Sequence, residues 1–128
     1  MTNILISYYS DYGEAMYDAL TNILLDNGNS VFRLNINNPS VSITSWGGNS
    51  NINNEELLNQ IKEFNPSVIL NFNNCLPQNC YDIIDNNCKI CAIDADAPEV
   101  AFWNKNTLLE NISRIFFLGL QSYSKIMY

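Results

Sequence analysis

The amino-acid sequence predicts a Rossmann-like, three-layer α/β/α domain built on a five-stranded parallel sheet. Apolar, Ile-rich runs alternate along the chain with helix-length amphipathic segments, which is typical of parallel sheets covered by helices. The apolar runs are continuous, as expected for strands that are buried on both faces. Right-handed crossovers then favour the strand order 3-2-1-4-5.

The expected elements follow one another without an internal repeat or a linker. Strands are predicted at 3–8, 30–36, 67–72, 89–93 and 113–118; helices at 13–27, 54–65 and 77–87, helical turns at 98–102 and 106–112, and a closing helix at 120–128. The polar stretch 37–54 is too long for an ordinary connection, which makes it functional or an excursion.

Local signals predict how several of these elements begin and end. In the first helix, a stripe of Met16, Leu20 and Leu24 is expected to face the sheet, with Asp11 and Glu14 forming a capping box. Gly28 is expected to end that helix. Asn53 or Asn54 is expected to cap the second helix, which ends before Pro66. Within the excursion, Val41, Ile43 and Trp46 are expected to form a short extra strand.

Length and charge limit the classes of function. The 128 residues suit a single domain, 1–128, and the net charge is −7. The six cations are scattered, so we expect neither nucleic-acid binding nor binding to an anionic membrane surface. No apolar run approaches the ~20 residues that span a bilayer. The N-terminus lacks a signal-peptide pattern, so we expect a cytoplasmic protein with reduced cysteines.

The segment after the first strand is a candidate ligand loop. It contains Tyr9, Ser10, Asp11 and Gly13 and matches neither the dinucleotide fingerprint nor a phosphate loop. Ser10 alone also provides too few hydroxyls for a flavin-phosphate loop. Two interpretations remain: a polar loop that caps the helix, or a ligand-facing loop whose aromatic rings stack on sugars.

Polar residues also follow the third and fourth strands. Asn73 and Asn74 have amides that donate and accept, which suits sugar hydroxyls, although Asn is abundant throughout this chain. Asp94 and Asp96 lie two residues apart at a strand end, so they are expected to point the same way. They are candidates for metal binding, for accepting hydroxyl bonds or for general-base catalysis, with helix capping as the structural alternative. A receiver-type acidic pocket is not expected, because it also needs an acidic pair after the first strand and a Lys near the fifth strand, and the sequence has neither there.

The sequence gives little support for a zinc site or for catalysis that depends on histidine. Cys88 and Cys91 have zinc-like spacing, and Cys75 and Cys80 complete a set of four thiols. However, Cys91 falls inside a predicted strand and the turn glycines of a zinc knuckle are missing, so buried free thiols are expected and no metal site. The chain has no His, which excludes Ser-His-Asp and Cys-His catalysis.

The stretch from Asp94 to Pro98, after an Ile-rich strand, resembles the D-x-D-[ST/A]-P segment of CgeB-like, spore-maturation-protein-type glycosyltransferases. The strand at 66–70 and the strand at 113–118, followed by a helix with Tyr123, are also similar to that family. The resemblance spans nearly the whole chain, through short motifs.

The resemblance implies the N-terminal, acceptor-side domain of a GT-B glycosyltransferase. Asp94 and Asp96 are then the catalytic residues, and Tyr9, Ser10, Asp11, Gly13, Asn73 and Asn74 bind a sugar, glycan or protein acceptor. The nucleotide-sugar donor belongs on a second Rossmann-like domain or partner chain, so this chain holds no cofactor and is not expected to transfer sugar alone. The alternative is a non-catalytic, flavodoxin-like binding or interaction domain, with Trp46, Phe102 and Trp103 as its contact patch.

Overall fold

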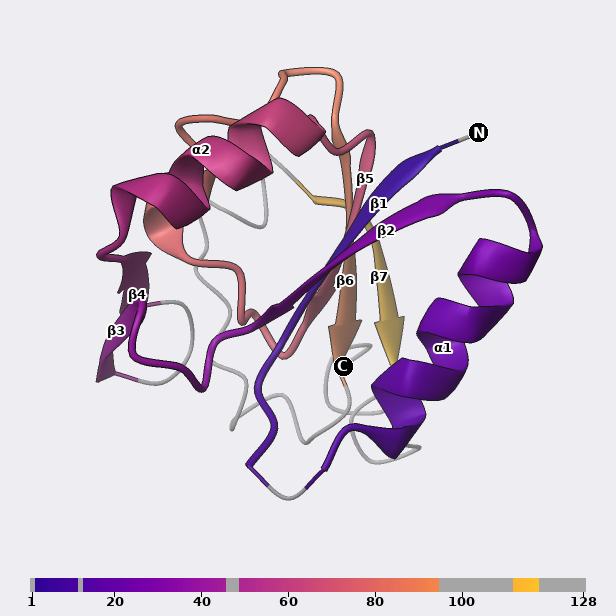
Figure 1. Ribbon diagram of the computed structural model, residues 1–128, viewed down its shortest axis with the longest axis horizontal. Coiled ribbons are helices and arrows are strands. Elements are labelled where there is room, and N and C mark those ends of the chain that lie inside the picture. Colours follow the sequence, from indigo (N-terminus) through magenta and orange to yellow (C-terminus); the bar gives the residue numbers. More distant parts are fainter. Residues whose placement is uncertain (1, 12, 46–48, 95–111, 118–128) are drawn as a thin grey trace, which may run out of the picture.

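The computed structural model describes residues 2–11, 13–45, 49–94 and 112–117, with the backbone alone described for Ser45, Asp94 and 112–117. Figure 1 shows a parallel sheet with a helix on either side. The elements are β1 (Asn3–Tyr8), α1 (Ala15–Asp26), β2 (Ser30–Asn35), β3 (Val41–Ser45), β4 (Asn49–Ile52), α2 (Glu55–Phe64), β5 (Val68–Phe72), the 3-10 turn η1 (Gln78–Cys80), β6 (Lys89–Asp94) and β7 (Ile112–Phe117). The expected α/β class with a parallel sheet is confirmed.

The strand order differs from the expected one. The sheet runs β2-β1-β5-β6, with β7 parallel to β6, so in chain order it reads 2-1-3-4-5 rather than 3-2-1-4-5. β5 pairs with β1 through Ile4↔Val68, on the side of β1 away from β2. The reason lies in β2: only Leu34 of its six residues is buried, as suits an edge strand. β1, with five buried residues, has a strand on both sides.

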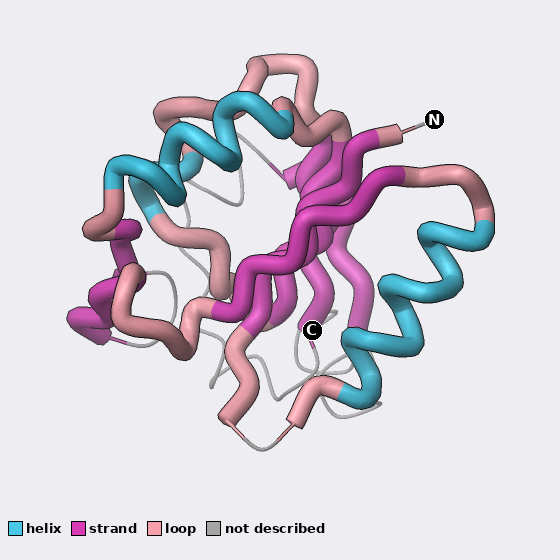
Figure 2. The backbone as a smooth tube through the Cα atoms, in the orientation of Figure 1, coloured by secondary structure: helices cyan, strands magenta, loops and turns pink. Residues whose placement is uncertain are grey.

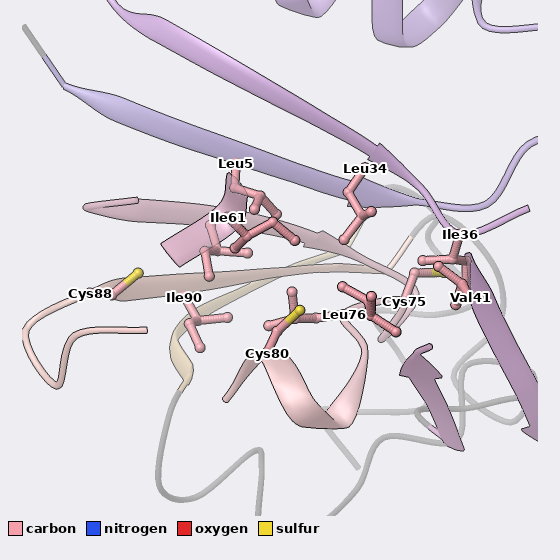
Figure 3. Close-up of a cluster of buried hydrophobic side chains, with 12 residues drawn as sticks. Leu5, Leu34, Ile36, Val41, Ile61, Cys75, Leu76, Cys80, Cys88 and Ile90 are labelled. Carbon is pink, nitrogen blue, oxygen red and sulfur yellow. The ribbon is translucent and has the colours of Figure 1, made fainter. Parts of the chain in front are cut away.

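Alternate residues of β1 point to opposite faces of the sheet, and each face has its own helix. Ile4, Ile6 and Tyr8 pack with α1, through Tyr17 and its neighbours. Leu5 packs on the opposite face with α2 and the segment after β5. That second cluster, drawn in Figure 3, consists of Leu5, Leu34, Ile36, Val41, Ile52, Ile61, Ile69, Cys75, Leu76, Cys80, Cys88 and Ile90. The two helices therefore cover two separate faces of one sheet.

α1 differs from expectation at its start and in its buried face. Its N-cap is Glu14, without a side-chain capping bond, so the capping box with Asp11 is wrong. Met16 and Ile23 are exposed, while Leu20 and Leu24 pack toward the sheet beside Tyr17. The inward stripe is therefore rotated from the expected one, because the large Tyr17 ring stacks on Tyr8 at 4.0 Å between ring centroids. Gly28 follows the helix with φ 84°, as expected.

The polar excursion contains an antiparallel hairpin, β3 and β4, which does not join the main sheet. The strand around Val41 and Ile43 is confirmed, Trp46 lies outside the described residues, and β4 was not predicted. After the hairpin, the Asn54 side chain caps α2 by accepting from the backbone N–H groups of Glu56 and Leu57. The cap prediction is confirmed. Asn65, in a left-handed conformation with φ 49°, ends α2 before Pro66.

The prediction of a helix at 77–87 is wrong, because only η1 and irregular turns form there. Asn79 is the physical reason. Its side-chain amide donates to the Ile52 carbonyl at 2.8 Å and its oxygen accepts from the Ile52 N–H at 2.9 Å. This pair of bonds anchors the segment to β4, and the backbone there closes into short i→i+3 turns, as in the bond from the Cys80 N–H to the Pro77 carbonyl at 3.0 Å. The tube in Figure 2 follows this loop between β5 and β6.

The expected helical segments at 98–102, 106–112 and 120–128 lie almost wholly outside the described residues, and residues 112–117 form β7. Within the described part of the chain, no helix has the length and apolar character needed to cross a membrane.

Candidate functional site

Three of the predicted site segments meet at one edge of the sheet. β1, β5 and β6 are parallel neighbours, so their carboxyl ends lie side by side. The chain leaves β1 toward β2 and returns to β5 on the other side, which makes the β1–β5 boundary the switch point where open α/β sheets bind ligands. Tyr9 to Gly13 follow β1, Asn73 and Asn74 follow β5, and Asp94 ends β6.

The loop after β1 is held by one side chain of β2. The Asn35 oxygen accepts from the Ser10 N–H at 3.1 Å, and its amide donates to the Ser10 carbonyl at 3.1 Å. Asn37 donates to the same carbonyl at 3.2 Å. Both backbone groups of Ser10 are thus bonded, while its hydroxyl donates to the carbonyl of Gly13 across the loop. Gly13 has φ 145°, a conformation that side-chain-bearing residues rarely adopt.

Below this loop, a charged cluster joins β1, α1 and β2. The fully buried Tyr8 hydroxyl donates to the Glu14 carboxylate and accepts from Arg33 Nη2 at 3.0 Å. Arg33 also pairs with Glu14 at 3.4 Å and with Asp18 at 2.8 Å. Its guanidinium carbon lies 5.3 Å from the centre of the Tyr8 ring. The cluster links the start of α1 to β1 and β2.

The cluster keeps Tyr8 protonated. Burial and the hydrogen bond to Glu14 raise the pKa of Tyr8 to about 12, against the opposing effect of Arg33. Burial opposes the charge of Arg33, yet its bonds to Asp18 and Tyr8 raise its pKa. Tyr8 is therefore a neutral donor at physiological pH, with a structural role.

The turn after β5 is held by backbone conformation instead. Asn73 and Asn74 have φ values of 49° and 57°, and the Cys75 N–H donates to the Phe72 carbonyl at 3.0 Å. Two consecutive positive φ values with this bond define a type I′ turn, in which Asn is one of the few tolerated residues. Asn74 is buried and Asn73 is half-buried. The turn conformation thus favours Asn at both positions.

Two buried side chains support this turn from below. Asn71 accepts from the Leu76 N–H at 2.9 Å, and the Ser7 hydroxyl donates to the Cys75 carbonyl at 2.9 Å. The Asn73 N–H donates to the Ile93 carbonyl at 2.8 Å, which joins the turn to the end of β6.

The predicted catalytic pair is described only in part. Asp94 is the last residue of β6, and its backbone is paired in register with Phe117 of β7. Its side chain and the whole of Asp96 lie outside the described residues. Of the predicted loop residues, Asp11 and Gly13 are exposed, Tyr9 and Ser10 are half-buried, and Tyr9 packs against the α2-side cluster. Asn74 is the only one of these that is buried away from solvent.

A cavity of about 450 Å³ lies beside the edge strand, a feature that the sequence analysis did not predict. It is open to solvent and is bordered by β2, the turn that follows it and the first turns of α2. Its lining consists of Phe32, Arg33, Leu34, Asn35, Asn38, Ser40, Asn54, Glu56, Leu57 and Gln60. Its volume lies in the range of small-molecule sites.

The four cysteines are free, and the described residues contain no cluster of metal-ligating side chains. Cys75, Cys80 and Cys88 are buried and Cys91 is half-buried, which confirms the prediction of buried free thiols for the first three. Burial raises the pKa of Cys80 to about 12. Burial, together with Asp85 and Cys91, raises the pKa of Cys88 to about 11. Both are protonated thiols and poor nucleophiles at neutral pH.

The sequence analysis did not predict that Glu14, Arg33 and Asn35 form the support of the loop. One signal was available: Arg33 and Asn35 alternate with apolar Phe32 and Leu34, which places both polar side chains on one face of β2. Comparison of the chain with protein-family models, with curated proteins and with solved structures found no match.

Proposed function

We propose that this chain is the acceptor-side domain of a glycosyltransferase, a Rossmann-like unit that holds a hydroxylated acceptor at the carboxyl edge of β1, β5 and β6. One observation carries the proposal: the Ser10 loop, the Asn73 turn and Asp94 belong to three neighbouring strand ends. An acceptor bound there contacts the hydroxyl and amide groups of the loops and is next to the end of β6. The sugar donor is supplied by a second Rossmann-like domain or a partner chain.

In this proposal Asp94 or Asp96 takes the proton from the acceptor hydroxyl as it attacks the donor sugar. A base at a strand end can be held within hydrogen-bond reach of such a hydroxyl. The loop residues bind and orient the acceptor, with the Asn35 bonds keeping Ser10 in one conformation.

The test is a transfer assay in a protein that contains the donor domain, comparing Asp94→Asn and Asp96→Asn with Asp82→Asn. Asp82 is an exposed acidic residue of the turn after η1 and does not belong to the strand-end segments. We expect at least one strand-end variant to lower kcat by about 100-fold or more, as loss of a general base does, while Asp82→Asn leaves it unchanged. Full activity in both strand-end variants would refute the proposal.

A second candidate is a non-catalytic, flavodoxin-like binding domain, and the strand order favours it. The order 2-1-3-4 of β2-β1-β5-β6 is that of flavodoxin-like sheets, not of the 3-2-1 dinucleotide type. Its proposed contact patch of Trp46, Phe102 and Trp103 lies outside the described residues. A concentration-dependent dimer in analytical ultracentrifugation that Trp103→Ala abolishes would favour this candidate; a monomer at all concentrations would count against it.

A further inference from the structure

The cavity beside β2 is separate from the switch point and has its own chemistry. It lies on the α2 side of the edge strand, whereas the Ser10 loop and the Asn73 turn follow the two strands further into the sheet. Its walls come from segments far apart in the sequence: β2, the turn at 38–40 and α2.

Part of the lining is a fixed frame. The Asn38 side chain donates to the Asn35 carbonyl and accepts from the Ser40 N–H at 2.8 Å. The Asn54 amide donates to the Ser40 hydroxyl at 3.2 Å, while its oxygen caps α2. These bonds join the three walls to one another, so the cavity has a defined shape before any ligand enters.

Other lining groups remain available. Glu56 and Gln60 stand one helical turn apart on α2, and among the described residues neither side chain has a hydrogen bond or an ion pair. Ser40 accepts a bond and still has its hydroxyl proton to donate.

The edge strand adds backbone groups to this set. The Ser30 N–H donates to the Thr2 carbonyl and the Ile36 N–H donates to the Tyr8 carbonyl, so even-numbered residues of β2 face β1. By alternation, the N–H and C=O of Arg33 point away from β1, toward the open edge and the cavity.

Charge and polarity select the ligand class. The Arg33 guanidinium is bonded to Tyr8 and Asp18 on the α1 side of the sheet, so Glu56 is the acidic side chain of the lining, without a partner among the described residues. A bound anion would be repelled by the Glu56 carboxylate, and no cation of the lining would offset that repulsion. The lining is mostly amide, hydroxyl and carboxylate, with Phe32 and Leu57 as its apolar part. Mixed donors and acceptors with a small apolar surface suit a neutral compound with several hydroxyls.

We propose that this cavity binds a neutral polyhydroxylated compound of monosaccharide size, with Glu56, Gln60, Ser40 and the Arg33 backbone as its hydrogen-bonding groups. The inference rests on this cavity alone: it needs neither a donor domain nor the strand-end aspartates, and it stands if sugar transfer fails.

The test is a nuclear magnetic resonance titration of the full chain with glucose and, separately, with N-acetylglucosamine. We expect saturable shifts at the amides of Arg33, Ser40 and Gln60, with binding in the millimolar range that suits so small a ligand. Inorganic phosphate and acetate at the same concentrations should leave these amides unchanged.

Matched variants on one helix assign the binding. Glu56→Gln should weaken it by about tenfold, because a charge-assisted bond is lost, and Gln60→Ala by about threefold. Glu63→Gln and Asn59→Ala, exposed on the same helix but outside the cavity, should bind as the unchanged chain does.

The proposal would be overturned by no shifts with either sugar, by tighter binding of the anions, or by equal weakening in the control variants. Shifts at Ser10 and Asn73 alone would also overturn it, while supporting the acceptor site of the proposed function. Failure of the two proposals is therefore distinguishable.

Discussion

The loop after β1 and the turn after β5 stand next to each other at the switch point but are built in different ways. Side chains of the neighbouring strand hold the first, chiefly through the two bonds between Asn35 and Ser10. Backbone conformation holds the second, through the positive φ values of Asn73 and Asn74. The first leaves Asp11 and Gly13 exposed, whereas the second buries Asn74.

The difference separates polar residues that a ligand can reach from those that the fold requires. In the turn after β5, amides that look suited to sugar hydroxyls are explained by the left-handed backbone. In the loop after β1, side chains of the neighbouring strand and turn hold the Ser10 backbone, and the Asp11 side chain is exposed. Four substitutions test this contrast, beginning with the largest expected effect.

Asn71→Ala should be the most damaging, lowering the free energy of unfolding by about 2–3 kcal/mol. It leaves the fully buried Leu76 N–H without its acceptor and removes the support of the β5 turn. Urea unfolding measures the change, with the exposed Asn59→Ala as the control. A loss below that of the control would mean that the turn does not depend on this bond.

Asn35→Ala should cost about 1–2 kcal/mol, because two bonds to a half-buried loop are lost. Hydrogen exchange at the Ser10 amide should quicken, while exchange at the Cys75 amide, in the β5 turn, should not change. Asn37→Ala, which removes a single bond to the Ser10 carbonyl, is the graded control and should have a smaller effect. Equal changes at both amides would show that the two segments are not independent.

Asn73→Ala should be less stable than Asn73→Gly by about 1 kcal/mol, since only glycine adopts a positive φ without steric cost. Thermal unfolding of the pair measures this difference. If the two variants unfold at the same temperature, the type I′ turn does not determine which residue is preferred at this position. In the transfer assay, Asn73→Gly removes the amide while keeping the turn conformation.

The last effect should appear only at alkaline pH. The folded pKa of Tyr8, about 12, lies above the ordinary value of 10.0, so the folded state keeps a proton that the unfolded state releases. The stability from this group is fully present below pH 10.0 and is lost as pH rises toward about 12. The unchanged chain should therefore lose free energy of unfolding across that pH window. Tyr8→Phe has no group at this position that titrates there, so its free energy of unfolding should rise relative to that of the unchanged chain. A constant difference would show that Tyr8 titrates normally.

The parallel α/β class, the positions of most elements and the Asn54 cap could be predicted from sequence, because each depends on local periodicity or capping. The order of the strands could not. The order depends on whether β5 pairs with β2 or with β1. The half-exposed residues of β2 indicate an edge strand only once the neighbours of that strand are known.

The helix at 77–87 was wrongly predicted for a related reason. Its first residues have a helix-like start, but Asn79 bonds to Ile52, 27 residues earlier in the chain. Likewise, Asn35 supports a loop 25 positions away. Such contacts leave no periodic trace in the sequence.

By itself, the sequence determined which segments form the strands of the main sheet. It also determined that serine, tyrosine and asparagine follow strands that became neighbours. Only the tertiary structure decided that β5 lies beside β1, that Asn35 holds Ser10, and that a polar cavity opens along β2. Local pattern follows from the period of each element, whereas neighbours, supports and cavities arise when distant elements share one surface.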